Sequence, residues 1–235
     1  NIANVGRFSG EAMGTLLRGC TRLRYLNASN NSGIVDSVFA ELELPPAYPG
    51  GSPTPIMLPN LERLSIACTG LSSFGVACMA ERCVNLVHLD ISEHKHITNA
   101  CLSVIAGCCR RLKSLWLNDC PALTDHGVLE IAYNCKWLEV LHLSSSIRYI
   151  DAWNSRFRQY SDTVLEAILD GLRCLKELSM RNQCDIHMRS PWLLMESSRR
   201  GGHQFLEKVD LRGVDELDLD GAAVVFQHCS ELCYA

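Results

Sequence analysis

Histidine and cysteine are the residue types in this sequence that could do chemistry, because both can act as metal ligands or in nucleophilic catalysis. The chain has 13 cysteines and 8 histidines. They come close together at His94-Lys-His96 and at His228-Cys229, which Cys233 follows. Zinc is conceivable at both places, but the sequence lacks the C-x-x-C pair that usually completes a zinc site, so we expect no metal. It leaves open a cysteine–histidine nucleophile pair, because such partners meet only in space.

Short motifs of other chemistries are absent from the sequence. It contains no G-x-x-x-x-G-K-[ST], G-x-G-x-x-G, H-E-x-x-H or G-x-S-x-G, which are typical of phosphate, dinucleotide, zinc-protease and serine-hydrolase sites. We therefore expect neither an enzyme nor a cofactor. The formal net charge of −4 argues against a nucleic-acid partner. No apolar run approaches the ~18 residues of a membrane span, so we expect no membrane either.

The spacing of the cysteines has another explanation, an internal repeat. Cys83, Cys109 and Cys135 are 26 residues apart, and a leucine that begins an L-x-x-L-x-L pattern follows each of them. The same pattern, or a looser copy of it, begins at Leu23, Leu61, Leu86, Leu112, Leu138, Leu175 and Leu206, and Leu232 begins one more that the chain end cuts off. Self-similarity at this period predicts a solenoid.

Segments with helical spacing lie between these leucine patterns. In residues 123–135, Thr124 or Asp125 is a suitable N-cap, and Val128 and Ile131 recur at helical spacing. The segments 71–83, 97–109, 160–172 and 217–229 align with it, 191–203 is the weakest copy, and 8–19 fit the helical half of a repeat that begins upstream. Each unit is thus expected to be a short strand, a turn and a helix.

Stacked units of this kind predict an α/β solenoid, with a curved parallel sheet on the concave side and helices on the convex side. We expect one domain over residues 1–235, with about seven to eight repeats, as a segment of a longer protein. The cysteines then serve as small, buried packing residues. Reduced cysteines indicate a cytoplasmic or nuclear protein.

The unit from Cys109 to Cys135, with Asn118-Asp-Cys120 and Leu123-Thr-Asp125, resembles the cysteine-containing leucine-rich repeat. That subtype is typical of F-box/LRR proteins, the substrate receptors of cullin-based ubiquitin ligases. The resemblance implies a substrate-recognition domain that binds a degradation substrate, with an Skp1-type adaptor bound through a segment outside these residues. The subtype also occurs in F-box-free relatives, so the alternative is a non-catalytic scaffold subunit of a large assembly, axonemal, ribosomal or similar.

The repeat spacing is longer in three places, which predicts insertions near 30–59, 147–159 and 181–191. The first is rich in proline and indicates an extended loop. The second contains a partner-binding candidate set of aromatic and basic residues, Tyr149, Trp153, Arg156 and Arg158, which are types enriched at interface hot spots. Alternatively, its aromatics, spaced by four, hold a short helix against the body.

Side chains between the leucines of each strand are expected to face the open concave side, because strand side chains alternate. The candidate partner-binding residues in this row are Arg63, His88, Asp90, Trp116, His142, Glu177 and Lys208. The row is polar and of mixed sign, which suits a protein partner. Trp116 is the best single anchor, or else an insertion loop covers it.

Overall fold

A parallel sheet of seven strands, in the order β1-β4-β5-β6-β7-β8-β9, runs the length of the molecule. The structure is a computed structural model and describes residues 1–5, 8–44, 52, 54–146, 160–183 and 206–213. The strands of this sheet are β1 (Tyr25–Asn27), β4 (Arg63–Ser65), β5 (His88–Asp90), β6 (Ser114–Trp116), β7 (Val140–His142), β8 (Glu177–Ser179) and β9 (Lys208–Asp210). Successive strands pair in register from one repeat to the next.

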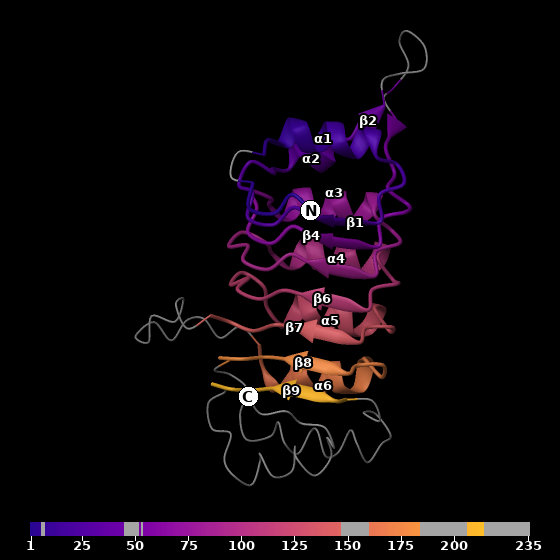
Figure 1. Cartoon of the computed structure of the whole chain (residues 1–235). Coiled ribbons are helices and arrows are strands. Elements are labelled where there is room, and N and C mark those ends of the chain that lie inside the picture. Colours follow the sequence, from indigo (N-terminus) through magenta and orange to yellow (C-terminus); the bar gives the residue numbers. More distant parts are fainter. Residues whose placement is uncertain (6–7, 45–51, 53, 147–159, 184–205, 214–235) are drawn as a thin grey trace.

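Helices stack in chain order against one face of the sheet (Figure 1). They are α1 (Gly10–Gly19), α2 (Ser37–Ala40), α3 (Ser73–Arg82), α4 (Asn99–Cys108), α5 (Asp125–Asn134) and α6 (Asp162–Gly171). The middle residue of each strand is a leucine or valine that is buried between sheet and helices. The α/β solenoid predicted from the repeat is therefore confirmed.

From α2 to α6, polar side chains join the start of each helix to the start of the next. The N-cap residue of one helix donates its backbone N–H to a side chain at the beginning of the preceding helix. The pairs are Asp36 with Ser72, Ser73 with Thr98, Asn99 with Thr124, and Asp125 with Ser161, at 2.7 to 3.0 Å. Thr124 is thus the N-cap residue of α5. The side chain of Asp125 accepts a hydrogen bond from the N–H of Ser161, the N-cap residue of α6. Gly127 lacks a side chain because a Cβ there would lie 2.7 Å from Asn99 Oδ1.

Residues 30–59, expected as an insertion with an extended loop, contain regular structure in their described part. The short helix α2 lies between α1 and α3, and it is followed by an antiparallel pair, β2 (Glu43–Leu44) and β3 (Thr54–Pro55). Phe39, Leu42 and Ile56 are buried in the common core. Part of this segment is therefore the helical half of a repeat, which the proline-rich composition concealed.

A left-handed turn follows most strands. Its positive φ falls on Asn30, Cys68, Glu93, Asp119, Asn182 and Gly213. The next position carries a buried polar group in several repeats, which satisfies backbone carbonyls inside the bend. Asn31 Nδ2 donates to the carbonyl oxygens of Ala28 and Ser29 at 2.8 and 3.0 Å.

His94 occupies the corresponding position in a later repeat. Its Nδ1 donates to the carbonyl oxygens of Ile91 and Ser92, each at 3.0 Å, and its Nε2 accepts from the N–H of Thr69 at 3.4 Å. Burial lowers the pKa of His94, so the neutral imidazole is the form that fits. His94 is thus a packing residue, equivalent to Cys120, and among the described residues no group of three His, Cys, Asp or Glu could hold a metal ion.

The ten cysteines in the described part of the chain are free thiols. Those of the repeat position, Cys83, Cys109 and Cys135, are fully buried, as the packing interpretation predicted. Burial raises the pKa of Cys109 to about 12 and that of Cys135 to about 11. These thiols are therefore protonated and poor nucleophiles at neutral pH.

Some predicted segments lie outside the described residues. They are the insertion 147–159 with Tyr149, Trp153, Arg156 and Arg158, most of the insertion near 181–191, the repeat copies 191–203 and 217–229, and the group His228, Cys229 and Cys233. None of the helices in the described ranges has the length and apolar character of a membrane span.

Candidate protein-binding surface

The concave surface carries side chains in three columns, because the strand alternation continues for two residues beyond each strand. The first column is Tyr25, Arg63, His88, Ser114, Val140, Glu177 and Lys208. The second is Asn27, Ser65, Asp90, Trp116, His142, Ser179 and Asp210. The third is Ser29, Ala67, Ser92, Asn118, Ser144, Arg181 and Arg212. Ser114 and Ser179 are buried among larger neighbours.

The residues predicted from the sequence fall in the first two columns and share one face. Arg63 and Lys208 are exposed, whereas His88, Asp90, Trp116, His142 and Glu177 are half-buried. The structure brings these residues together as a continuous row. Whether an insertion loop covers Trp116 concerns residues 147–159, outside the described ranges.

Trp116 lies between two histidines in the middle of the row. Its ring stacks on His88 with centroids 6.4 Å apart, and it meets His142 edge-on at 6.0 Å. Ser114 Oγ and His88 Nδ1 are 2.9 Å apart, and His142 Nε2 lies 3.1 Å from Glu177 Oε1. Three adjacent strands thus present one rigid aromatic cluster, which we call the His88–Trp116–His142 cluster.

On the N-terminal side of this cluster the surface is hollowed over a volume of about 650 Å³, which we call the N-terminal hollow. Tyr25, Arg63, His88, Asp90 and Trp116 are among its lining residues. Burial lowers the pKa of His88, and the positive charges of Arg63 and Lys113 lower it further. At neutral pH His88 is therefore uncharged here, and Arg63 supplies the positive charge.

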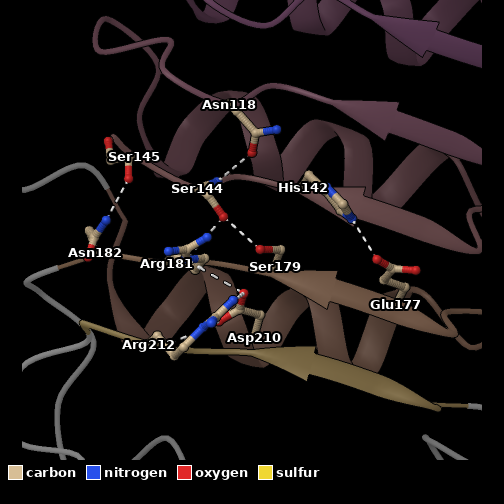
Figure 2. Close-up of polar contacts among 10 residues, drawn as sticks. All are labelled: Asn118, His142, Ser144, Ser145, Glu177, Ser179, Arg181, Asn182, Asp210 and Arg212. Carbon is tan, nitrogen blue, oxygen red and sulfur yellow. Dashed lines mark hydrogen bonds and ion pairs between the residues drawn. The ribbon is translucent and has the colours of Figure 1, made fainter. Parts of the chain in front are cut away.

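A larger hollow of about 830 Å³, which we call the C-terminal hollow, extends from Ala67 and Asp90 along the third column to Arg212. Its arginines and Lys208 pair with carboxylates of the same hollow, and Figure 2 shows the pairs of Arg181 and Arg212 with Asp210. Arg212 binds both carboxylate oxygens of Asp210 at 2.8 and 2.9 Å, and Arg181 Nε lies 3.6 Å from the same carboxylate. Lys208 Nζ lies 3.5 Å from Glu177. Burial raises the pKa of Asp210, but the hydrogen bonds from Arg212 and the positive charges of Arg212 and Arg181 together outweigh burial and hold the pKa below its usual value.

Hydrogen bonds also connect the uncharged residues of the C-terminal hollow. Ser144 donates its N–H to Asn118 Oδ1 at 2.9 Å, and its hydroxyl lies 2.6 Å from that of Ser179. The N–H of Arg181 donates to Ser144 Oγ at 3.2 Å (Figure 2). Three successive repeats are therefore joined through side chains at the edge of the sheet.

Sequence reasoning missed the third column and with it Ser144, Arg181 and Arg212. The signal was present, because these residues keep the same alternation two positions beyond each strand. The L-x-x-L-x-L motif stops one residue before this column, whereas the backbone hydrogen bonds between repeats continue through it, as from Asp119 N–H to the Ser144 carbonyl at 2.9 Å.

Comparison with known proteins identifies the fold and no family. No family model matches the sequence. A crystal structure of the yeast Rad7–Elc1 complex is similar, with a TM-score of 0.50 and 16% identity over 96% of this chain and 65% of the other. The chain therefore spans less than two thirds of that neighbour. A TLR13–ssRNA13 complex, with a TM-score of 0.47, 13% identity and coverage of 90% of this chain and 28% of that one, is too distant to support an argument. Together with the in-register sheet, the first likeness shows a leucine-rich-repeat solenoid.

Proposed function

We propose that this chain is a non-catalytic, protein-binding repeat module, and that it is the substrate-recognition domain of an F-box/LRR-type ubiquitin-ligase receptor. The observation that carries the binding role is the His88–Trp116–His142 cluster between two hollows. Half-buried aromatic side chains held by their neighbours lose little conformational entropy on binding and act as interface anchors.

The ligase assignment has two supports. One is the resemblance of the repeat to the cysteine-containing subtype, whose cysteines are here buried and reduced. The other is the fold likeness to Rad7, which was crystallised in complex with Elc1. We extend this to a cytoplasmic or nuclear location, since buried free thiols persist in reducing compartments.

Affinity purification of the full-length protein from its own cells tests both parts. We expect the wild type to recover an Skp1-type adaptor and a cullin, together with proteins that the Trp116→Ala variant loses. Trp137→Ala is the matched control, because Trp137 is 64% exposed and lies outside both hollows. Both variants should still recover the adaptor. Both should also keep the wild-type fold, as measured by circular dichroism.

If the wild type recovers neither an adaptor nor a cullin, the ligase assignment is wrong. If the wild type and Trp116→Ala recover every partner equally, the proposed binding role of the concave face is wrong. The two parts of the proposal can therefore fail separately.

A scaffold subunit is the second candidate, favoured by aromatic side chains outside the concave surface. Phe74 in α3, Tyr133 in α5 and Trp137 after α5 are between 62% and 64% exposed. Such side chains are expected to be covered in a large assembly. The scaffold function predicts the reverse pattern in the same experiment, with partners lost by Trp137→Ala and kept by Trp116→Ala.

A further inference from the structure

Among the described residues no carboxylate pairs with Arg63, in contrast to Arg24, Arg181 and Arg212. Its neighbour Arg24 is held by both carboxylate oxygens of Glu62, at 2.7 and 2.9 Å. Both guanidinium groups lie over the ring of Tyr25, that of Arg63 at 5.4 Å and that of Arg24 at 5.7 Å from its centroid, but only Arg24 also has a carboxylate partner. A cation placed on an aromatic ring is oriented but not neutralised. Arg63 is thus a fixed positive charge at the rim of the N-terminal hollow.

Aromatic surface is available on both sides of this charge. Tyr25 is 55% exposed beside Arg63, and Trp116 closes the other end of the N-terminal hollow. His88 lies between them and stacks on Trp116. The hollow therefore offers one cation without a carboxylate partner and two partly exposed aromatic side chains, a combination suited to an anion next to an aromatic or apolar group.

The distance between cation and tryptophan sets the spacing of a ligand. Arg63 is on β4 and Trp116 on β6, with β5 between them. Neighbouring strands lie ~4.8 Å apart, and Trp116 is two residues further along its strand than Ser114, which is in register with Arg63, so the two positions are separated by about 12 Å. An extended peptide rises ~3.3 Å per residue and covers this distance in about three to four residues.

We propose that the N-terminal hollow binds an extended acidic–aromatic segment of a protein partner, with an Asp or Glu carboxylate on Arg63 and an aromatic side chain against Trp116. The inference rests on the proposed function only in assuming a protein partner, and it does not need the ligase assignment. The concave face would then select partners by an acidic and an aromatic side chain on one extended segment.

Asp90 favours a peptide over a nucleic acid. Its carboxylate lies in the same hollow and accepts hydrogen bonds from Ser65 Oγ and from the N–H of Ser92, both at 3.1 Å. A phosphate backbone that crossed the hollow would meet this negative charge. A peptide can place its carboxylate on Arg63 and direct a backbone N–H toward Asp90.

The test begins with selection of peptides of about 12 residues, long enough at ~3.3 Å per residue to cross the hollow, from a random display library on the whole chain. We expect the wild type to enrich an acidic residue two to four positions from an aromatic one. Arg63→Glu should lose the acidic preference and select Lys or Arg at that position. Arg110→Gln is the matched control, because Arg110 is exposed and lines neither hollow, and it should select the same peptides as the wild type.

Fluorescence anisotropy on the selected peptide then measures each contact. Replacing its acidic residue by Lys should weaken wild-type binding roughly tenfold, as expected for a charge-assisted hydrogen bond, and should strengthen binding to Arg63→Glu. Replacing its aromatic residue by Ala should weaken wild-type binding, with no further loss in Trp116→Ala.

Several outcomes would overturn the proposal. They are a selection that yields no peptide above background, an unchanged acidic preference in Arg63→Glu, and tighter binding of a single-stranded oligouridine than of the peptide. A failed adaptor purification leaves this result intact, so the failures of the two proposals are distinguishable.

Discussion

The two hollows of the concave surface are built on one sheet but differ in how their charges are neutralised. In the C-terminal hollow, Arg212 and Arg181 share Asp210, and Lys208 pairs with Glu177. In the N-terminal hollow, Arg63 rests on the ring of Tyr25. The arginines and the lysine of the larger hollow are thus paired with carboxylates, whereas the smaller one has a cation without a carboxylate partner beside aromatic side chains.

This difference shows that size alone does not identify a binding site. A ligand that enters the C-terminal hollow must compete with ion pairs that already hold its side chains, and the loss of those pairs offsets the new contacts. A ligand on Arg63 gives up no existing ion pair within the described structure. Charge satisfaction therefore favours the smaller hollow.

The largest expected effect tests whether the two hollows share one core. Leu115 is fully buried in β6, the strand that carries Trp116. Leu115→Ala should cost about 2–5 kcal/mol, because it leaves a cavity. Urea unfolding followed by circular dichroism measures this, with Trp137→Ala as a control expected to change stability by less than ~0.5 kcal/mol. If the variant lost protection against hydrogen exchange on one side of β6 only, the two halves of the repeat array would be shown to unfold independently.

The second prediction converts the C-terminal hollow into a copy of the other. Asp210→Asn removes the charge that Arg181 and Arg212 share, so we expect affinity for an acidic peptide to rise about fivefold, or ~1 kcal/mol. Anisotropy in the Arg63→Glu background isolates this gain. Glu139→Gln is the control, because it changes the net charge equally but releases Lys113 and Lys176, which line neither hollow. An equal gain in both variants would mean that only net charge matters.

The third prediction concerns how the buried His94 makes the stability of the protein depend on pH. The pKa of His94 is lowered mainly by burial, against the opposing carboxylates of Asp90 and Glu93, so the unfolded chain binds a proton more readily than the folded one. The stability from neutral His94 is complete above the unfolded pKa of ~6.5 and is lost as the pH falls through it toward the lower folded pKa.

Thermal unfolding at about pH 7.5 and about pH 5.5 measures this loss. His94→Asn is the matched variant, because Asn31 makes the same two carbonyl contacts in an earlier repeat. We expect the variant to show a smaller fall in Tm between the two pH values than the wild type. An identical fall in both would assign the acid sensitivity to other groups.

The smallest effect concerns thiol reactivity and should leave stability unchanged. Cys20 and Cys68 are exposed, so iodoacetamide should modify them in the folded protein. Cys109 and Cys135 should stay unmodified, since burial raises the pKa of these thiols to about 12 and about 11. Peptide mass spectrometry with and without urea reads the difference. Rapid modification of Cys109 without urea would mean that the repeats open locally.

Much of the fold could be predicted because the repeat enforces it. The leucines at 86, 89, 112, 115, 138 and 141 leave only one face of each short strand for the core, which orients every residue between them. The helix in 37–40 was not predicted, because the proline-rich segment that follows it concealed the repeat.

The sequence by itself therefore determined the α/β repeat array, its buried cysteines and which residues line the first two columns of the concave face. These follow from periodicity, since stacked units of equal length must align their strands. Only the tertiary structure decided which charges are free. Arg24 and Arg63 stand in consecutive strand regions with similar neighbours, yet Glu62 pairs with Arg24 across 38 residues of chain. Ion pairing depends on distances of a few ångströms between repeats, which a linear pattern does not contain.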